Sequence, residues 1–548
     1  MTGSPSTGIA DRLTHRSVDE SFTAVSRARR NTRRQAWSVL AVVTGFLLGA
    51  CQASPQANDP GTAANNTPAP AEQIGPAGAT PSGPIAAVCG NQVPGPAAAP
   101  AGAVVVDPAV DNDLAAKTEA NPPRTTFWLA PGKHTLGRDQ YGQVNPKDGN
   151  RYIGAPGAIL DGRGLNRYAF VFKASNVTVS HLTVRGFVPP AQEGVVNHDS
   201  GEGWIIEHNT IEENKGAGLM AGFRQQVRHN CLRNNGQYGM NAFGGELVVE
   251  GNEIVGNNTD DLENAIPGGC GCTGGVKFWD VNGADVRNNW VHDNRGAGLW
   301  ADTNNNDFLI EGNVIESNDG EALFYETSYN LVLRNNTIRN NAHVRGREFA
   351  DRDDNFPVAA IYLSEAGGEP RVPARTDKIE IYGNTLENNW SGITAWENAD
   401  RYCNSAASTS TGYCTRLVTS PTTCSPPGIN DTPLYDDCRW KTQWLDIHDN
   451  IFTYVPDVVG CSNGMAGRMA IFANYGTVPE WSPYMGRVVQ EAITFNQQNV
   501  WHDNTYRGPW TFVAYEVGPG VNPAEWQAEP YRQDAGSTFS DNSSGPTC

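Results

Sequence analysis

The chain has 548 residues, enough for several ordinary domains or for one extended repeat domain. It carries 59 Asp and Glu against 40 Lys and Arg, a formal net charge of −19 at pH 7. This balance argues against a nucleic-acid or anionic-membrane partner for the folded part, because both would be repelled, and it is compatible with a neutral glycan.

Residues 1–50 have the pattern of an export signal. Arginines between Arg27 and Arg34 precede the apolar run WSVLAVVTGFLLGA, which is too short for a membrane-spanning helix. The run ends in LGA directly before Cys51 and resembles a bacterial lipobox, which implies cleavage before Cys51 and lipid attachment to its thiol. We therefore expect an exported protein, either a cell-envelope lipoprotein on the outer face of the cytoplasmic membrane or a secreted one.

Residues 51–103 follow as a Pro- and Ala-rich segment with few large apolar side chains, so we predict a flexible linker. We expect the folded domain to span residues 104–548. Without Cys51, ten of the 11 cysteines remain, and an even number in an exported chain predicts disulfides. These cysteines are Cys89, Cys231, Cys270, Cys272, Cys403, Cys414, Cys424, Cys438, Cys461 and Cys548. Their spacing is not that of a zinc site, and it leaves the pairing open.

An Asn-x-apolar-x-x-Asn pattern repeats along the folded part. Its first asparagines lie 21 to 24 residues apart where no insertion intervenes. The copies start at Asn209, Asn230, Asn252, Asn289, Asn313, Asn336, Asn384 and Asn499, with a degenerate copy at Asn450. Short β-like runs broken by Asn and Gly predict one coil of a parallel β-helix per repeat. Asparagines stacked at the corners can hydrogen-bond along the axis and tolerate a left-handed backbone.

We therefore predict an all-β fold, a single-stranded right-handed parallel β-helix, since parallel crossovers are right-handed. Insertions at 258–274, 342–358 and the Cys-rich segment at about 400–441 are expected to form the rims of a groove. The segments TFWLAPGKHTL and NRYIGAPGAILDGRG, followed by the Asn coils, resemble the right-handed parallel β-helix superfamily that includes pectate lyases and several glycoside hydrolases.

One strand of each coil starts with a small residue and then alternates, which sends two side chains per strand outward. Stacking the coils produces two outward columns. The first column reads Met220, Asn241, Lys277, Trp300, Phe324, Tyr362 and Thr394. The second column reads His198, Gly222, Phe243, Trp279, Asp302, Glu326, Ser364 and Trp396.

Asp302 and Glu326 are vertical neighbours in the second column, about 4.8 Å apart at the strand level. Carboxyl groups held about 5 Å apart are typical of a retaining glycosidase, with one as nucleophile and the other as acid/base. Three tryptophans on the outward face, Trp279, Trp300 and Trp396, favour a sugar-binding function over a solvated surface. The candidate substrate-binding residues are Lys277, Trp279, Trp300, Phe324, Tyr362, Trp396, Glu365, Glu397 and His198.

The stretch GLWADTNNN, followed one coil later by ALFYETS, resembles the Asp-bearing and Glu-bearing coils of parallel β-helix glycoside hydrolases of the β-xylosidase type. That resemblance implies Asp302 as nucleophile and Glu326 as acid/base. The long Cys-bearing insertion departs from it and leaves the sugar open.

The sequence thus predicts a carbohydrate-active enzyme, a retaining glycoside hydrolase acting as a monomer on a cell-wall or environmental polysaccharide. We expect no metal or other cofactor for this reaction. One alternative is a polysaccharide lyase with Lys277 as base and carboxylates that hold Ca²⁺. Another is a non-catalytic glycan-binding or adhesion module.

Overall fold

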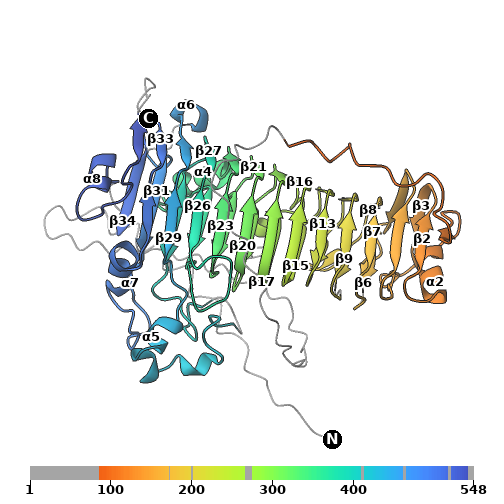
Figure 1. The fold of residues 1–548 in the computed structure, drawn as a ribbon, viewed down its shortest axis with the longest axis horizontal. Helices are drawn as coiled ribbons and strands as arrows, with labels where there is room; N and C mark the ends of the chain where they lie inside the picture. The colour runs from red at the N-terminus through yellow and green to blue at the C-terminus, as the bar shows by residue number, and fades with distance from the viewer. Residues whose placement is uncertain are drawn as a thin grey trace, which may run out of the picture. The chain divides into compact units, whose positions relative to one another are not determined.

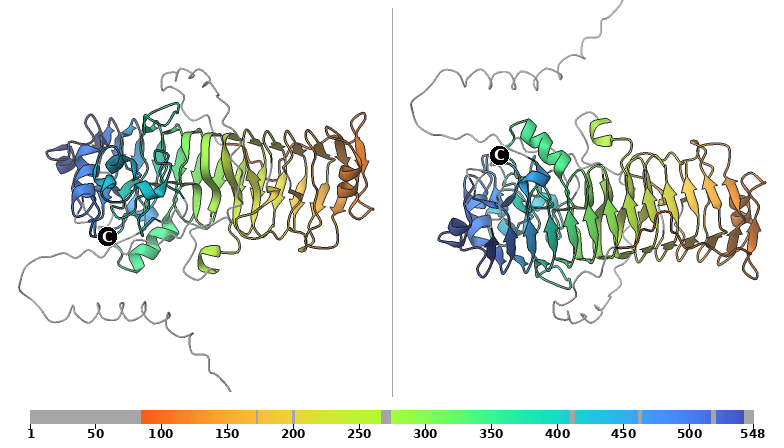
Figure 2. Two further views of the ribbon diagram at one scale, coloured as in Figure 1. Left: turned by 90° about the horizontal axis from the view of Figure 1, so that it is seen from below. Right: turned by 90° about the horizontal axis from the view of Figure 1, so that it is seen from above.

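The computed structural model describes residues 85–171, 173–198, 201–265, 274–408, 413–460, 464–515 and 520–540. Within these ranges the chain winds into stacked coils of parallel strands (Figure 1, Figure 2). The predicted signal, Cys51 and the cysteines Cys270, Cys272, Cys461 and Cys548 lie outside the described residues.

The strands form two sheets. The larger sheet has 22 strands and contains β1 Val104–Val106, β2 Thr126–Leu129, β4 Arg151–Gly154, β6 Phe170–Val171, β7 Thr178–Ser180, β9 Gly194–His198, β10 Ile205–Glu207, β12 Ala217–Ala221, β13 Gln226–Arg228, β15 Tyr238–Glu250, β17 Gly274–Arg287, β19 Ala297–Asp302, β20 Asn306–Glu311, β22 Leu323–Glu326, β23 Leu331–Arg334, β25 Ile361–Ser364, β26 Ile379–Tyr382, β28 Ile393–Glu397, β29 Leu445–His448, β31 Arg468–Ala473, β32 Val500–His502 and β34 Thr511–Tyr515.

The smaller sheet has 13 strands, β3 Gly132–Thr135, β5 Ala158–Asp161, β8 Thr183–Arg185, β11 Thr210–Glu212, β14 Cys231–Arg233, β16 Glu253–Val255, β18 Trp290–His292, β21 Val314–Glu316, β24 Thr337–Arg339, β27 Thr385–Glu387, β30 Ile451–Thr453, β33 Thr505–Arg507 and β35 Thr538–Ser540. The short helical segments are α2 Asp113–Ala120, α3 Leu262–Ala265, α4 His343–Asp351, α5 Leu434–Asp437, α6 Pro456–Val459, α7 Val488–Glu491, α8 Pro523–Gln527, η1 Pro421–Thr423, η2 Gly428–Asn430 and η3 Ala492–Asn496.

Each central coil presents three faces. One ladder of the larger sheet runs from β9 through β12, β15, β17, β19, β22, β25, β28 and β31 to β34. A second ladder runs through β20, β23, β26, β29 and β32, and joins the first because β15 and β17 continue through the corner between them. The smaller sheet is the third face. The fold is the predicted right-handed parallel β-helix, with one strand per coil in each ladder.

Two asparagine ladders join the coils, as predicted. In both, the side-chain oxygen of one Asn accepts from the main-chain N–H and the side-chain amide of the Asn on the preceding coil. The first ladder is Asn209, Asn230, Asn252, Asn289, Asn313, Asn336, Asn384, Asn450 and Asn504. The second is Asn214, Asn235, Asn257, Asn294, Asn318, Asn341 and Asn389. The repeated residue therefore satisfies buried polar groups at the corners.

The structure corrects two details of this pattern. Asn504, predicted to be the second asparagine of its copy, continues the first ladder directly after Asn450, because β29 and β32 pair in register at His448 and His502. The left-handed backbone belongs to the residue before each ladder asparagine, for example His208 (φ 57) before Asn209. The asparagine side chain hydrogen-bonds the buried polar groups of the corner, while the residue before it makes the turn.

Residues 85–103, assigned to the linker by sequence, are held against the β-helix. Cys89 forms a disulfide with Cys231 of β14, and Glu253 of β16 accepts hydrogen bonds from the main-chain N–H groups of Val88 and Cys89 at 2.7 and 2.8 Å. Further along, the indole of Trp128 donates to the Pro96 carbonyl at 3.0 Å. The contacts of the folded domain thus begin before the predicted boundary at 104.

The helices lie in the connections between coils. Figure 2 shows α3 and α4 standing off the same side of the stack. Both follow strands of the smaller sheet, β16 and β24, and they fall inside the predicted insertions. The segments α5, η1 and η2 belong to the Cys-rich insertion. Among the described residues, no helix is long and apolar enough to cross a membrane.

Candidate active site

Strand pairing reproduces the first predicted column throughout and the second from Phe243 to Trp396. The first column pairs Met220, Asn241, Lys277, Trp300, Phe324, Tyr362 and Thr394 in that order. In the second, Phe243 pairs with Trp279 and Trp279 with Asp302, while Glu326 pairs with Ser364 and Ser364 with Trp396. The register between β19 and β22 places Glu326 directly beside Asp302 on the next coil.

The columns face away from the core, but most of their central residues are covered. Asp302 is 4 % exposed and Glu326 2 % exposed. The expectation of three outward tryptophans on an open face is wrong for Trp300 and Trp396, which are buried, and Trp279 is half-buried. The reason is tertiary: the insertions that follow β24 and β28 pack back over this face.

Asp302 is held by a cation from the preceding coil. The Lys277 Nζ lies 2.9 Å from the Asp302 Oδ2, and the Thr303 hydroxyl donates to Oδ1 at 2.8 Å. The same ammonium lies 4.1 Å from the centre of the Trp300 ring, a cation–π contact. Lys277 is therefore engaged on two sides within the column.

Glu326 has different neighbours. The Arg401 guanidinium lies 2.6 Å from its Oε1, and the Trp300 indole N–H donates to Oε2 at 3.1 Å. The same Arg401 nitrogen lies 3.4 Å from an oxygen of Glu365. Arg401 thus lies between two carboxyl groups, both contributed by the ends of strands in the first ladder.

These surroundings shift the pKa values of Asp302 and Glu326 in opposite directions. Burial acts to raise the pKa of Asp302, but the charge and hydrogen bond of Lys277, the Thr303 hydroxyl and the charge of Arg401 outweigh it and lower that pKa. Burial raises the pKa of Glu326, and the negative charge of Asp302 adds to the rise, against the opposing charges of Arg401 and Lys277. Two carboxyl groups on adjacent coils whose pKa values are shifted in opposite directions are the kind of pair that acid/base chemistry uses.

Glu365 is a third buried acid at this site. Burial raises the pKa of its carboxyl to about 7, and the charge of Glu326 adds to the rise, while Arg401 and the Ser364 hydroxyl oppose it. Its backbone leaves the regular strand at a φ of 45°, and its buried carboxyl lies beside the Ser364 hydroxyl and the Arg401 guanidinium. There it accepts from the main-chain N–H of Asn398 at 2.9 Å. Glu365 therefore contacts the Arg401–Glu326 pair and does not form a rim.

Glu397, the other predicted rim ligand, is also fully buried. Its Oε1 lies 3.1 Å from the Arg439 guanidinium, and its Oε2 accepts from the Thr442 main-chain N–H and the Gln497 amide, each at 2.9 Å. These contacts anchor the end of the Cys-rich insertion to β28. We assign Glu397 to structure.

The aromatic residues of the first column stack along the coils. Trp300 and Phe324 lie 5.2 Å apart between ring centres at 8°, and Phe324 and Tyr362 lie 4.7 Å apart at 20°. In the second column Trp279 contacts Phe243 at 5.8 Å and Tyr413, from the Cys-rich insertion, at 5.2 Å. The predicted sugar-binding rings are thus brought together around the carboxyl pair, with Phe243 and Tyr413 as additional members.

His198 does not belong to the second column at the predicted position. Gly194 pairs with Ala217 and Val196 with Leu219, one residue away from the predicted alignment, and Asn197 then adopts a φ of 70° within β9. The His198 ring stacks on Tyr168 at 5.3 Å, and its Nε2 lies 3.9 Å from Glu193. On β9, His198 is four coils from Asp302 and contacts neither carboxyl group.

Sequence reasoning missed Arg401, the residue that contacts Glu326. It sits just after β28, at the start of the Cys-rich insertion, 75 residues from its partner. The only available signal was the set of arginines within this insertion, and nothing in their spacing indicates which coil they reach. Arg416 illustrates the same point, since its guanidinium bonds the Asn304 carbonyl at 2.7 Å and Asp280 at 3.0 Å.

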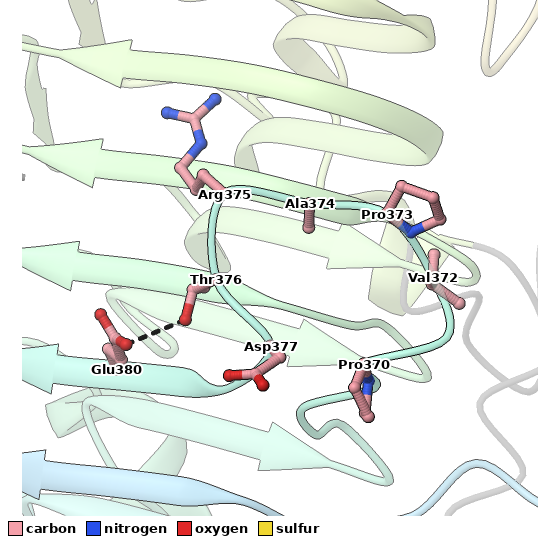
Figure 3. Close-up of a pocket in the computed structure, with 8 residues that line it drawn as sticks. All are labelled: Pro370, Val372, Pro373, Ala374, Arg375, Thr376, Asp377 and Glu380. Carbon is pink, nitrogen blue, oxygen red and sulfur yellow. Dashed lines mark hydrogen bonds between the residues drawn. The ribbon is translucent and has the colours of Figure 1, made fainter. Parts of the chain in front are cut away.

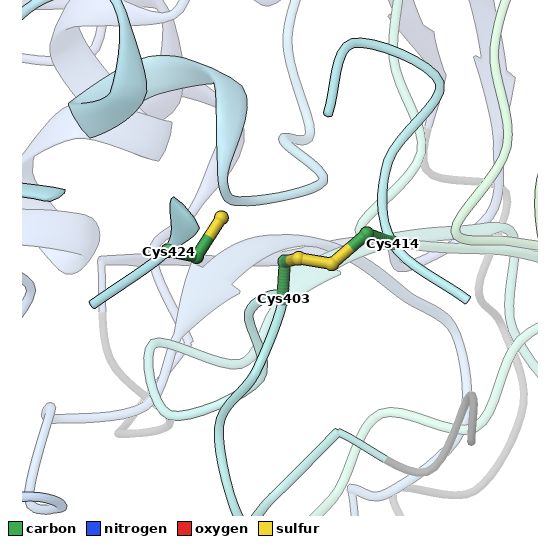
Figure 4. A group of neighbouring side chains, drawn as sticks. All are labelled: Cys403, Cys414 and Cys424. Atoms are coloured by element: carbon green, nitrogen blue, oxygen red, sulfur yellow. A yellow bond between two sulfur atoms is a disulfide. The ribbon is translucent and has the colours of Figure 1, made fainter. Parts of the chain in front are cut away.

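Two disulfides brace the Cys-rich insertion, Cys403–Cys414 and Cys424–Cys438. Figure 4 shows Cys403 bonded to Cys414, with Cys424 beside them. The insertion docks on the turn after β19: the Asn304 side chain donates to the Cys414 carbonyl at 2.8 Å and accepts from the Trp440 indole at 3.0 Å. The predicted disulfides therefore brace the element that covers the site.

Two groups of described residues bring three His, Cys or Asp ligand atoms within 4.8 Å of one another. One is Cys403, Cys414 and Cys424, whose sulfurs are already paired in disulfides. The other is Asp446, His448 and His502 on β29 and β32, where Lys378 lies 2.7 Å from Asp446. Neither group includes Asp302 or Glu326.

A pocket of about 420 Å³ lies on the loop between β25 and β26, away from the carboxyl pair. Figure 3 shows its lining residues, Pro370, Val372, Pro373, Ala374, Arg375, Thr376, Asp377 and Glu380. Arg375 is occupied by ion pairs to Asp285 and Asp307 at 2.7 and 2.8 Å. The pocket contains none of the predicted site residues.

Residues 193–372 match the family model described as "Right handed beta helix region". A comparison with curated proteins finds no match. Among solved structures, the chain is similar to the A-module of a mannuronan C-5 epimerase of Azotobacter vinelandii, with 15 % identity over 54 % of this chain and 87 % of that one and a TM-score of 0.35.

The chain is also similar to the catalytic domain of a GH87 α-1,3-glucanase in complex with nigerose, with 10 % identity over 83 % of this chain and 70 % of the other and a TM-score of 0.37. A PL6 family alginate lyase shares 11 % identity over 78 % of this chain and 52 % of the other, with a TM-score of 0.32. Because these names state three different activities, the chemistry of this chain has to be argued from its own residues.

Proposed function

We propose that the protein is a carbohydrate-active enzyme, a retaining glycoside hydrolase with Asp302 as nucleophile and Glu326 as acid/base. One observation carries the proposal: two carboxyl groups on adjacent coils have unlike partners, Lys277 for Asp302 and the Trp300 indole with Arg401 for Glu326. Lys277 lowers the pKa of Asp302, whereas burial and the negative charge of Asp302 raise the pKa of Glu326 against the opposing charge of Arg401, so the pair favours an ionised Asp302 beside a protonated Glu326.

The proposed reaction follows from the ionised state of Asp302 and the protonated state of Glu326. The Asp302 carboxylate attacks the anomeric carbon, and the bond to the leaving oxygen breaks as Glu326 transfers its proton to that oxygen. A water molecule, deprotonated by the Glu326 carboxylate, then displaces Asp302 from the glycosyl ester and restores both groups. Burial of the pair excludes competing water and strengthens the local electrostatic interactions.

The other members of the columns bind and orient the sugar. The rings of Trp279, Trp300 and Phe324 offer flat apolar surfaces for sugar faces. Lys277, already paired with Asp302 at 2.9 Å, keeps that carboxyl ionised, and this pairing disfavours its use as the base of a lyase. The disulfides support an exported protein, and the lipid anchor at Cys51 remains part of the proposal.

Product analysis with two isosteric variants tests the proposal. Wild-type protein is incubated with arabinan, galactan, xylan and pectin, and the active substrate is then used with Asp302→Asn and Glu326→Gln. We expect each variant to lose at least about 10³-fold in kcat, with the fold intact by circular dichroism. Glu246→Gln, a change at an exposed acid on β15, is the matched control and should retain activity.

The anomeric configuration of the product and the rescue of a variant by azide distinguish the nucleophile from the acid/base. The first product should keep the anomeric configuration of the substrate, and azide should restore turnover to Glu326→Ala as a glycosyl azide of retained configuration. Inverted product would overturn the assignment of Asp302 as nucleophile. Products with unsaturated ends would identify a lyase, and binding without release of reducing ends would identify a non-catalytic module.

A further inference from the structure

The column that contains Asp302 and Glu326 is open to solvent on one side and closed on the other. Towards the N-terminal coils, Trp279 is half-buried and Phe243 is 38 % exposed. Towards the C-terminal coils, Ser364 is 2 % exposed, Trp396 8 % and Phe472 1 %. All of these residues occupy the same outward column, because Trp396 pairs with Phe472 as Ser364 pairs with Trp396.

A single side chain closes the C-terminal side. Phe356, which follows α4, places its ring edge-on against Tyr362 at 5.5 Å, Trp396 at 6.1 Å and Phe472 at 5.7 Å. These three partners come from β25, β28 and β31, so Phe356 covers three successive coils. The cover is one continuous aromatic cluster directly beyond Glu326.

The segment that carries Phe356 is fastened on both sides. The Thr394 hydroxyl donates to the carbonyl of Pro357, and the Arg468 guanidinium donates to the Asn355 side chain at 2.8 Å. The apolar residues beneath it, Trp396, Ala470, Phe472 and Val513, form a buried cluster of their own. A sugar chain that continued past Glu326 in this direction would have to displace this packed segment.

The opposite side offers a surface that suits a glycan. Phe243 and Trp279 lie 5.8 Å apart between ring centres on adjacent coils, in register with Asp302. Exposed aromatic rings in a row are unusual on a solvated face, and they present apolar surfaces against which the C–H faces of sugars pack. Tyr413, edge-on to Trp279, borders this surface.

We propose that the enzyme removes sugars from a chain end: the terminal unit lies at Asp302 and Glu326 against the Phe356 cluster, and the rest of the glycan extends over Trp279 and Phe243. The inference rests on the proposed hydrolase function and adds the direction of the chain and the mode of cleavage. The added binding residue is Phe243, with Phe356 as the residue that limits the chain.

Cleavage mode is measured on the polysaccharide that wild-type protein hydrolyses, by size analysis of early products together with viscosity. We expect a single small product from the start and a slow fall in viscosity. Early products of many lengths with a rapid fall in viscosity would overturn the inference and leave the proposed function standing. Absence of hydrolysis on every substrate would instead contradict the proposed function.

Phe243→Ala tests the direction. We expect its loss in kcat/KM to grow with oligosaccharide length and to reach about tenfold on the longer substrates, through KM. Tyr475→Ala removes an aromatic ring that is 55 % exposed outside both columns, and is the matched control. A loss for Phe243→Ala that is no larger than that of the control on any substrate would overturn the proposal.

Phe356→Ala tests the closed end independently. Removal of the ring opens the face beyond Glu326, so we expect internal cleavage products to appear that wild type does not form. Circular dichroism and thermal unfolding verify that the variant is folded. If a folded Phe356→Ala enzyme produced only the wild-type product while Phe243→Ala behaved like its control, the chain-end assignment would be wrong.

Discussion

The stability of the coils should depend strongly on single ladder asparagines, and Asn313→Ala is the sharpest test. Its side chain is 1 % exposed. The oxygen accepts from the main-chain N–H and side-chain amide of Asn289 at 2.9 and 3.0 Å. The amide donates to the Val286 carbonyl at 2.9 Å, to the Glu311 carbonyl at 3.2 Å and to the Asn336 side chain at 3.0 Å.

Some of these groups keep another hydrogen-bond partner when the Asn313 side chain is removed, and others do not. The Asn336 oxygen keeps the main-chain N–H of residue 313 at 2.9 Å, and the Asn289 amide keeps the Val249 carbonyl at 2.9 Å. The Asn289 main-chain N–H and the Val286 carbonyl lose this partner in a buried site. At about 1–3 kcal/mol for each deprived buried group, the expected loss in unfolding free energy is about 2 to 6 kcal/mol.

Equilibrium urea unfolding, followed by both circular dichroism and tryptophan fluorescence, measures this loss as a shift of the midpoint. Asn145→Ala is the control, because Asn145 is exposed and a surface change should stay within about 0.5 kcal/mol. If Asn313→Ala unfolded within 1 kcal/mol of this control, taking 1 kcal/mol as roughly the lower limit for an orphaned group, the reasoning about buried ladder groups would be refuted.

The remaining predictions concern the site and its disulfides. The pH profile of kcat/KM should fall on its acid side below pH 3.8, where Asp302 becomes protonated, and on its basic side above pH 4.5, where Glu326 loses its proton. An acid limb above pH 3.8 or a basic limb below pH 4.5 would contradict the assigned roles. Arg401→Met removes a charge that lowers the pKa of Glu326, so the basic limb should move to higher pH, and an unmoved limb would show that Arg401 does not act on this acid. Replacing Cys89 and Cys231 by Ser opens a loop of 142 residues and should cost about 5 kcal/mol of unfolding free energy by the chain-entropy model, measured by urea unfolding; no loss would contradict a restraint by residues 85–103.

Repetition in the sequence was sufficient to predict much of the fold. A ladder asparagine is recognisable because the same corner recurs in every coil, so its identity depends on local geometry that the sequence repeats. The neighbour relation of Asp302 and Glu326 follows in the same way, since two strands in the same phase of consecutive repeats must pair. Alternation along a strand then decides which side chains point outward.

That reasoning failed where the backbone departs from the repeat. The pairing of β9 with β12 is shifted by one residue from Gly194 onwards, and Asn197 takes a left-handed conformation within β9, so His198 leaves its predicted column. At the end of β25, Glu365 likewise has a left-handed backbone, and its carboxyl contacts Arg401 instead of forming a rim. Neither departure is visible in the residue pattern, because alternation predicts direction only while the strand stays regular.

The environment of the site depends on packing between distant segments. Insertions have no repeat, so nothing in their sequence tells which coil they contact, yet one insertion places Arg401 on Glu326 and another places Phe356 over three coils. Those contacts join residues far apart in the chain and determine burial, and burial with its nearby charges sets the opposite pKa directions of Asp302 and Glu326. That two carboxyl groups meet on adjacent coils could be predicted from the sequence, because it depends on the repeat alone. What each carboxyl group can do depends on packing between segments that no repeat relates.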